Sequence, residues 1–459
     1  MHLAPTERQL RLRAELRAYF RDLMPEGPPP PTDTAAQRTL LRRIGDDGML
    51  GLGWPEEYGG QGRGPDEQFV FFDEACRAGA PVSMVTLNTV GPTLMKYGTE
   101  AQKTYFLPRI LRGETVFAIG YSEPEAGTDL ASLRTKAVRT TDGTSPHHAG
   151  PPAGARDGSA PGGVIPVAAA AHAPHADTAN HADTANHPAA DTANHPAADA
   201  ANHAAADGAH RLGDWLVDGQ KIFTSNAHNA DWIWLACRTD PDAPRHRGIS
   251  IILVPTDAPG FSWTPIQTVG GLMTTATYYD SVRVPAGHLV GPENGGWGLI
   301  TNQLNHERVA LAALGMQAED FYASALHGAR TPDPVTGKRR IDEPWVRIRA
   351  AEAHARLAAT RLLSWRLVGD VEAGGPAPGD ASGVKFAGTE SAVEVYRMCQ
   401  EIAGGAGFVR AGSPGAFDGG ELERMNRAAQ INTFGGGVSE VQREIVATMR
   451  LGMKGRGRR

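Results

Sequence analysis

The chain has 459 residues, of which 41% are hydrophobic and 21% are charged, and its formal net charge is -6. This is the composition of a globular protein of two or three domains with enough apolar residues for a sizeable core. The acidic balance argues against nucleic acid as the main partner, and the longest apolar runs, such as ISIILVP (249–255), are too short to span a bilayer.

The N-terminal part of the chain has the periodicity of helices. The segments ERQLRLRAELRAYFRDL (7–23) and EQFVFFDEACRAG (67–79) repeat apolar residues at helical spacing, and WPEEYGGQGRG (54–64) predicts a loop between them. The first helix is charged and amphipathic and lacks the apolar run of a secretory signal. We therefore expect a cytoplasmic protein with reduced cysteines, and a helical domain over residues 1–114.

Residues 115–290 change to short runs that are typical of strands. DWIWLACRT (231–239) and GISIILVP (248–255) are continuous apolar runs, and YYDSVRVP (278–285) alternates apolar and polar residues. An Asp-Gly turn signal interrupts WLVDGQKIF (215–223). These runs predict a β-rich central domain.

An insertion at about 143–211 has neither the helical nor the strand pattern of the segments around it. It consists of Ala, Pro, Gly, Asp and His, with DTANH repeated at drifting intervals, and it has almost no large apolar side chains. Its many histidines invite a metal-binding interpretation, but a metal site needs ligands held in fixed geometry, which this composition does not supply. We predict a disordered loop without a metal site, placed between AVRTTDG and GDWLVDG, two strands of one hairpin.

Helical periodicity returns over residues 291–459. Long helices are predicted at 346–367 and 383–402, and the chain ends in a basic tail, KGRGRR (454–459), that we expect to be solvated. The pattern alone thus predicts an α+β protein with helical, strand-rich and helical domains in that order.

The stretch NQLNHERVALAALG (302–315) places Glu307 on the apolar face of a predicted helix, between Leu304 and Leu311. A carboxylate in such a place is costly unless it is paired or protonated. The residues alone leave two interpretations open. Either Arg308 neutralises Glu307 in a salt bridge, or Glu307 is a catalytic base whose pKa is raised by burial.

Four motifs resemble the acyl-CoA dehydrogenase family in the same order: GYSEPEAGTD (120–129), KIFTSNA (221–227), GGAGF (404–408) and FGGGVSEVQREIVA (434–447). The resemblance covers nearly the whole chain outside the insertion. It implies an N-terminal helical domain, a central β-barrel over 115–290 and a C-terminal four-helix bundle over 291–459.

The resemblance also implies FAD as the cofactor. Hydroxyl groups and a glycine backbone in the first motif can bond ring oxygens and phosphates, and an aromatic ring in the second can stack on the flavin. The alternative is that these segments are an ordinary turn and a strand end with Phe223 in the core. The predicted cofactor-binding residues are Tyr121, Ser122, Gly127, Thr128, Phe223, Thr224 and Ser225.

The family mechanism needs a carboxylate that accepts the α-proton of the thioester in a dry pocket. Most members carry this Glu in the C-terminal motif, but the matching position here is Gly436. A branch that resembles isovaleryl-CoA dehydrogenase places the base on a helix directly before an Arg. The resemblance therefore assigns Glu307 as the base and places Arg308 near the CoA moiety.

Three departures concern the side of the cofactor that a neighbouring subunit completes. The Arg-x-x-Phe-Gly motif of most relatives is absent, Glu401 replaces a Gln beside the expected pyrophosphate, and Val438 replaces a Thr. This resembles bacterial mixed-subunit acyl-CoA dehydrogenases, several of which act on steroid side chains. We therefore expect a second, related subunit in an α₂β₂ assembly.

The leading functional prediction is FAD-dependent oxidation of an acyl-CoA substrate to its 2,3-enoyl form, with electrons passed to an electron-transfer flavoprotein. Two alternatives remain open at this point. One is an acyl-CoA oxidase-like enzyme whose reduced flavin meets oxygen, and the other is a non-catalytic partner subunit. The residues do not indicate which acyl group is bound.

Overall fold

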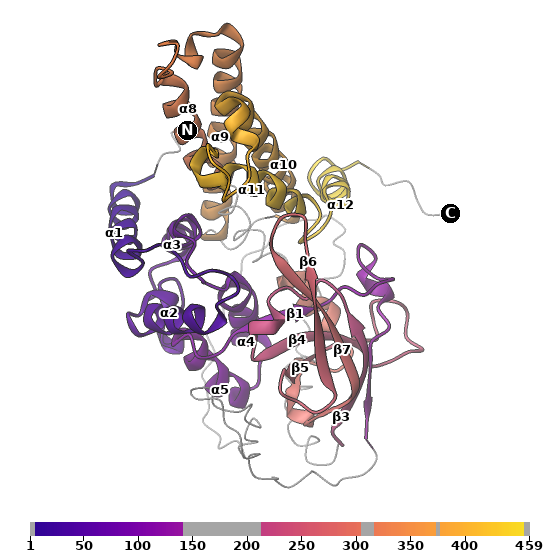
Figure 1. The fold of residues 1–459 in the computed structure, drawn as a ribbon. Helices are drawn as coiled ribbons and strands as arrows, with labels where there is room; N and C mark the ends of the chain where they lie inside the picture. The colour runs from indigo at the N-terminus through magenta and orange to yellow at the C-terminus, as the bar shows by residue number, and fades with distance from the viewer. Residues whose placement is uncertain (1–4, 141–212, 304–315, 373–376, 454–459) are drawn as a thin grey trace, which may run out of the picture.

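The structure, a computed structural model, describes residues 5–140, 213–303, 316–372 and 377–453 (Figure 1). The N-terminal region contains α1 (Glu7–Leu23), α2 (Thr34–Asp46), α3 (Pro65–Ala78), α4 (Gly91–Tyr97) and α5 (Glu100–Leu111). Helix α1 begins where Thr6 and Gln9 form a capping box, and its buried Leu12, Leu16 and Phe20 follow one face. Within the described residues, no helix is both long and apolar enough to cross a membrane.

The strands form one sheet beside these helices. They are β1 (Phe117–Gly120), β2 (Lys136–Arg139), β3 (Trp215–Lys221), β4 (Trp232–Arg238), β5 (Ile249–Pro255), β6 (Phe261–Gln267), β7 (Met273–Val284) and β8 (Leu289–Val290). Their order is β6-β7-β3-β2-β4-β5-β8, and β1 pairs in parallel with β4.

The expected closed barrel is wrong for the described strands, because they form an open sheet. Strand β6 pairs only with β7, and the two-residue strand β8 pairs only with β5, so the two ends of the order do not meet within the described residues. The middle of the sheet is also weakly connected, because β2 and β4 share a single residue pair, Lys136 with Arg238. The helical, strand-rich, helical architecture is otherwise confirmed.

The hairpin predicted across the insertion is confirmed by its two strands. Strands β2 and β3 are antiparallel, with Arg139 opposite Trp215, and the N–H of Thr140 donates to the carbonyl oxygen of Asp214 at 2.8 Å. The insertion between them lies outside the described residues. Pairing of β2 with β3 therefore requires only that the ends of the two strands be held close together.

Replacing residues 145–209 with a short Gly-Ser link is expected to leave thermal stability and activity nearly unchanged. The reason is that loop length enters the free energy of closure only logarithmically, at about 0.6 kcal/mol per doubling. Differential scanning calorimetry and turnover assays of the two chains test this. A melting temperature lower by several degrees, or activity of the full chain that depends on added zinc, would count against it.

The C-terminal region contains α8 (Ala318–Arg330), α9 (Pro344–Glu372), α10 (Pro378–Ala403), α11 (Glu421–Ala428) and α12 (Ser439–Ile445). The two long helices predicted there are confirmed, and each begins a few residues earlier than predicted. Pro344 and Pro378 explain this, because proline is well suited to the first turn of a helix. A second hydrophobic core lies among these helices and includes Leu357, Tyr396 and Leu422.

The first hydrophobic core is shared by the N-terminal helices and the sheet. The ring of Phe106 on α5 lies 5.3 Å from Phe117 and 5.1 Å from Trp232, both on strands. The carboxamide of Gln102 donates to the carbonyl oxygens of Gly287 and Leu289 at 2.9 and 2.8 Å. The boundaries at residues 114 and 290 stay a prediction, since this core crosses the first of them.

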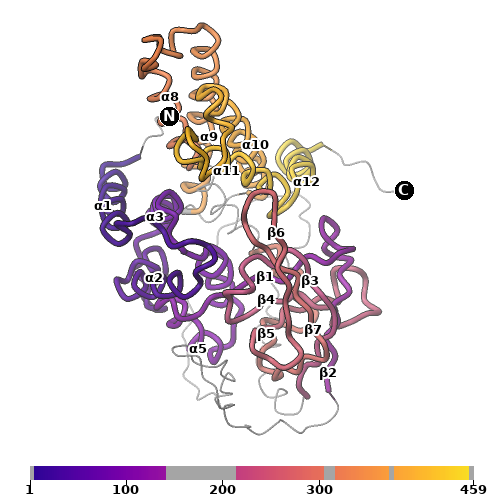
Figure 2. The backbone as a smooth tube through the Cα atoms, viewed as in Figure 1, coloured from indigo at the N-terminus to yellow at the C-terminus, as the bar shows by residue number. Residues whose placement is uncertain are grey.

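The β6–β7 hairpin reaches from the sheet to the C-terminal helices, as Figure 2 shows. At its tip, Arg427 on α11 donates to the carbonyl oxygen of Val269. A Cβ at Gly270 would lie 2.9 Å from the Cα of Ala428, so only glycine permits this approach. The sheet is thereby braced against the C-terminal helices.

Candidate active site

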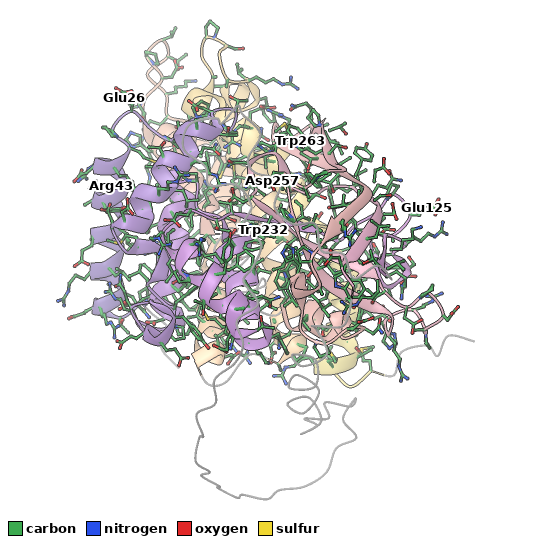
Figure 3. All side chains as sticks on the ribbon, turned by 90° about the horizontal axis from the view of Figure 1, so that it is seen from below. Glu26, Arg43, Glu125, Trp232, Asp257 and Trp263 are labelled. Carbon is green, nitrogen blue, oxygen red and sulfur yellow. The ribbon has the colours of Figure 1, made fainter. Side chains whose placement is uncertain are left out.

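Two of the sequence motifs meet at the end of β3. The 120–129 motif begins at the end of β1, the 221–227 motif begins at the end of β3, and the N–H of Ile222 donates to the carbonyl oxygen of Ser122 at 2.8 Å. In Figure 3, Trp232 marks the neighbouring buried strand and Glu125, on the turn of the first motif, lies at the edge of the molecule. Residues separated by about one hundred positions thus form one surface.

A buried ion pair fastens these motifs. Lys221 Nζ donates to Glu123 Oε1 at 2.8 Å and to the carbonyl oxygen of Tyr121 at 3.0 Å. The Glu123 carboxylate also accepts the N–H groups of Arg134 and Thr135 at 2.7 and 2.8 Å. Burial alone would raise the pKa of Glu123, but the charge of Lys221 and these hydrogen bonds lower it, so the carboxylate is ionised at neutral pH.

Phe223 presents its ring to the outside. Its backbone φ is 59°, a left-handed conformation that costs a bulky residue on the order of 1–3 kcal/mol, and the residue is 60% exposed. The next residue enforces this geometry, because the N–H of Thr224 donates to Thr275 O at 2.9 Å and the Thr275 hydroxyl donates to Thr224 O at 2.6 Å. The alternative that Phe223 packs in the core is therefore wrong.

Four of the predicted cofactor residues face outward and fit a flavin. Among the described residues, the hydroxyls of Ser122 and Thr128 have no protein hydrogen-bond partner, and a Cβ at Gly127 would meet no atom within 4 Å. An exposed aromatic face at Phe223, beside available hydroxyl donors and open space, suits a planar ring with polar edges. The chemistry of this donor set is compatible with FAD.

The other three predicted cofactor residues are engaged with protein. The hydroxyl of Tyr121 donates to Gln303 Oε1 at 2.5 Å, and Thr224 is buried. The hydroxyl of Ser225 lies 3.1 Å from that of Thr274, although the residue itself is exposed. These contacts hold the backbone around Phe223 and Ser122, and the binding of a cofactor by these three residues stays a prediction.

Glu307, the predicted base, and Arg308, the predicted CoA contact, lie outside the described residues. The nearest described residues on either side are Gln303 and Met316, and both are buried. The interpretation of Glu307 as base or as salt-bridge partner therefore stays a prediction.

Comparison with known proteins places these features in a family. Models of the N-terminal, middle and C-terminal domains of acyl-CoA dehydrogenases match residues 6–114, 193–282 and 294–450. Acyl-CoA dehydrogenase FadE26 of Mycobacterium tuberculosis is 41% identical over 99% of this chain and 99% of its own length. The chain belongs to the acyl-CoA dehydrogenase family.

Two solved structures are similar over their whole length. The Tcur3481-Tcur3483 steroid ACAD is 45% identical, with a TM-score of 0.78 over 99% of this chain and 100% of the compared chain. The ChsE4-ChsE5 complex from Mycobacterium tuberculosis is 41% identical, with a TM-score of 0.77 over 99% and 100%. Like its relatives, this acyl-CoA dehydrogenase is an oxidoreductase that acts on a CH–CH bond.

In this acyl-CoA dehydrogenase, two arginines contact the end of α10, directly before the glycine turn at 404–408. Arg349 Nε lies 2.8 Å from Glu401 Oε2, and Arg340 donates to the carbonyl oxygens of Ile402 and Glu401 at 2.8 and 3.1 Å. Gly404 makes room for the second guanidinium, because a Cβ there would lie 2.7 Å from Arg340 Nη1. The negative charge of Glu401 is therefore partly neutralised within the chain, which sequence reasoning missed.

Lys385 was also missed. It lies on α10, is only 2% exposed, and donates from Nζ to the carbonyl oxygens of Asn432 and Gly437 at 2.9 and 2.6 Å. These carbonyls flank the turn that contains Gly436, which has a φ of 65°. A single lysine in the apolar stretch GVKFAG (383–388) is the sequence signal that points to such a buried cation.

Proposed function

We propose that this chain is the FAD-binding, catalytic subunit of an acyl-CoA dehydrogenase that oxidises the CoA thioester of a steroid side chain to its 2,3-enoyl form. The observation that carries the proposal is the outward-facing surface of Ser122, Thr128 and Phe223, held by the Glu123–Lys221 pair. A strained backbone that displays an aromatic ring is typical of active and ligand-binding sites, which favours the catalytic subunit over a non-catalytic partner.

Different described residues are proposed to bind different parts of FAD. The Phe223 ring would stack on the flavin, and the hydroxyls of Ser122 and Thr128 would bond its polar edge and phosphates. Gly127 keeps the backbone open for close approach, as its empty surroundings allow. When bound, FAD supplies a hydride acceptor for the β-hydrogen of the substrate.

Glu307 is the proposed base, and its role is to take the α-proton of the thioester. A carboxylate can do this only where burial raises its pKa toward that of a weak carbon acid. The support for Glu307 is its position before Arg308 on a predicted apolar helix face and the presence of Gly436 at the family's other base position. Arg308 is proposed to lie near the CoA moiety.

A steroid side chain is the proposed acyl group because a 45% identical relative is a steroid ACAD. Turnover with straight-chain, branched and steroid-side-chain CoA thioesters is the test. The steroid thioester is expected to have the largest kcat/KM, with an artificial electron acceptor reduced and little peroxide formed. Preference for a straight chain would contradict the substrate assignment, and stoichiometric peroxide would favour an oxidase over transfer to an electron-transfer flavoprotein.

The proposed assembly contains a second acyl-CoA dehydrogenase-like subunit. Both similar structures are named as pairs of proteins, and the two motif residues Phe408 and Phe434 are 59% and 57% exposed here. Large apolar side chains at a functional motif are typical of a surface that another chain covers. Val438, together with Glu401, whose charge Arg349 neutralises only in part, favours a different second chain over a second copy of this one at the cofactor site.

Expression of the chain alone is therefore expected to yield sparsely flavinated protein, and co-expression with the related subunit should restore both flavin and turnover. Flavin per chain, measured by absorbance after denaturation, and mass by light scattering are the measurements. We expect an α₂β₂ mass with fewer flavins than chains. One tightly bound FAD per chain in the lone protein, with full turnover, would contradict the proposed assembly.

A further inference from the structure

Helix α9 carries apolar side chains on two faces. The inner face lies in the second hydrophobic core and includes Val346, Ala350, Ala353 and Leu357. The outer face is exposed and consists of Ile348, Ala351, Ala355, Ala359 and Leu362. Ile348 is 66% exposed and Leu362 is 45% exposed. A helix that is apolar on two faces is normally covered on both, and exposed apolar patches of this kind mark surfaces where another chain packs.

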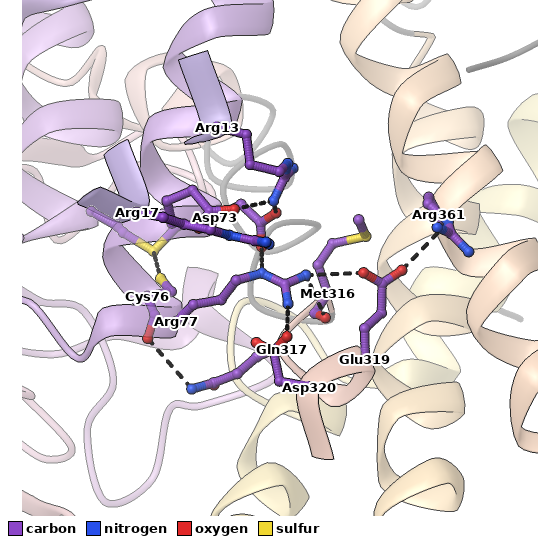
Figure 4. Close-up of polar contacts among 12 residues, drawn as sticks. Arg13, Arg17, Asp73, Cys76, Arg77, Met316, Gln317, Glu319, Asp320 and Arg361 are labelled. Atoms are coloured by element: carbon purple, nitrogen blue, oxygen red, sulfur yellow. Dashed lines mark hydrogen bonds and ion pairs between the residues drawn. The ribbon is translucent and has the colours of Figure 1, made fainter. Parts of the chain in front are cut away.

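The contacts of α9 with the rest of the described chain lie on its other sides. Helix α10 shares the second hydrophobic core with α9. Arg361 on α9 lies 3.4 Å from Glu319 on α8, and Glu319 also accepts from Arg77 on α3 at 3.0 Å, as Figure 4 shows. These contacts fix α9 against the body of the protein and leave the outer face exposed.

The outer face has a symmetric sequence pattern. Ile348 and Leu362 lie seven residues on either side of Ala355. Ala351 and Ala359 lie four residues on either side of it. Spacings of four and seven keep side chains on one face of a helix. An antiparallel copy of α9, related by a two-fold axis at Ala355, would therefore place each large side chain opposite a large one and each alanine opposite an alanine.

The charges beside the outer face are complementary to a second copy as well. Glu352 and Arg356 lie one turn apart, with 3.3 Å between Oε1 and Nη2. They stand three residues before and one residue after Ala355. Across the two-fold axis, Arg356 of a second copy would come within two residues of Glu352, about 3 Å along the helix axis. Each copy would thus offer an acid to the base of the other.

We propose that the outer face of α9 is the surface on which two copies of this chain pack, with their α9 helices antiparallel around a two-fold axis at Ala355. The inference rests on the proposed function, in which an α₂β₂ assembly contains two copies of this chain, and it names the contact between them. The related subunit is assigned to a different surface, at Phe408 and Phe434. A self-complementary face closes a pair and leaves no free surface for further growth.

The first test follows the mass of the full chain, expressed alone, by sedimentation over a range of concentrations. The unaltered chain is expected to be a dimer that dissociates on dilution. Ala355→Arg brings two guanidinium groups together at the axis and is expected to weaken dimerisation at least tenfold. Ala14→Arg, at an exposed alanine on α1, is the matched control and should leave the mass unchanged. Arginine is a good helix former, so both variants should keep the helical circular dichroism of the unaltered chain.

Charge reversal tests whether the second chain is a copy of this one. Glu352→Arg leaves two arginines beside the outer face, and Arg356→Glu leaves two glutamates. Each variant alone is expected to dimerise several-fold more weakly, because like charges meet across the axis. A mixture of the two variants opposes arginine to glutamate and is expected to restore dimerisation. This rescue tests the proposal even if Ala355→Arg fails to fold.

The co-expressed assembly separates this inference from the proposed function. Ala355→Arg is expected to split the assembly into pairs with one copy of each subunit, with unchanged flavin per pair. If the unaltered assembly holds no flavin and has no turnover, the proposed function fails, whatever the masses show.

Three results would overturn the assignment of the outer face. The first is a lone chain that is monomeric at every concentration, and the second is an unchanged dimer in Ala355→Arg or no rescue by mixing. The third is loss of the related subunit from Ala355→Arg while the two copies of this chain stay together, which would assign the outer face to that subunit.

Discussion

Replacing Glu307 by Gln is expected to lower kcat by about 10²- to 10⁴-fold, the usual contribution of a general base. The amide has nearly the shape of the carboxylate but cannot accept the α-proton of the thioester. The fold and bound flavin should remain, because the change removes a charge without adding volume. Steady-state turnover, flavin absorbance and melting temperature of the variant are the measurements.

The competing interpretation, in which Arg308 only neutralises Glu307, predicts the opposite pattern. Turnover would persist and the melting temperature would fall, because Arg308 would lose its partner. Glu293→Gln is a suitable control, since Glu293 forms a surface pair with Arg139 at 3.0 Å and has no assigned role. Retention of more than about a tenth of the original activity by Glu307→Gln would rule out the base assignment.

Replacing Lys221 by Met is expected to destabilise the protein by about 3–5 kcal/mol, because it leaves the Glu123 carboxylate buried without its charge partner. The Lys221 side chain is 0% exposed and that of Glu123 is 8% exposed, so water cannot substitute for the ammonium group. The turn at 120–129 loses its anchor in the same change. The free energy of unfolding, measured with denaturant, and the flavin content are therefore expected to fall together.

A matched lysine substitution on β2, which pairs with the strand that contains Lys221, provides the control. Lys136 lies 3.8 Å from Asp218 and its side chain is 60% exposed, so Lys136→Met should cost less than about 1 kcal/mol. Adding Glu123→Gln to Lys221→Met should recover part of the lost stability, since the amide oxygen still accepts from the backbone and carries no charge. Equal costs for the two lysine variants would show that the buried pair is not important.

Lowering the pH is expected to weaken the same pair, Glu123 with Lys221. The pKa of Glu123 is lowered in the folded protein, so its contribution to stability is present above the carboxyl pKa of the unfolded chain. That contribution is lost as the pH falls through the lower, folded pKa. The Glu123→Gln, Lys221→Met double variant should lack this part of the acid dependence.

Features that depend on local sequence patterns could be predicted from the sequence. The two long C-terminal helices and the β2–β3 hairpin follow from apolar periodicity and turn residues, and the structure confirms them. The meeting of the 120–129 and 221–227 motifs was implied by the family resemblance and not by periodicity. The open sheet was not foreseen, because strand closure depends on pairing between β6 and β8, which no local pattern encodes.

Most polar contacts of the candidate site could not be predicted from the sequence. The Tyr121–Gln303 hydrogen bond joins positions 182 residues apart, and the Glu123–Lys221 hydrogen bond joins positions 98 residues apart. Single-residue patterns do not reveal such pairs, although a Lys before a buried strand end and a Gln on an apolar helix face are signals of polar groups that need partners. The ion pair of Glu401 with Arg349 was not predicted, because the two residues are distant in sequence.

Anaerobic mixing of the flavin-bearing assembly with the CoA thioester of a steroid side-chain acid tests the central claim most directly. The absorbance band of oxidised flavin and the mass of the thioester product are followed together. We expect the band to fall in proportion to active sites, with a product two hydrogen atoms lighter than the substrate, and neither change in Glu307→Gln. An unchanged flavin spectrum with bound, unaltered thioester would contradict the assignment of this chain as a dehydrogenating subunit.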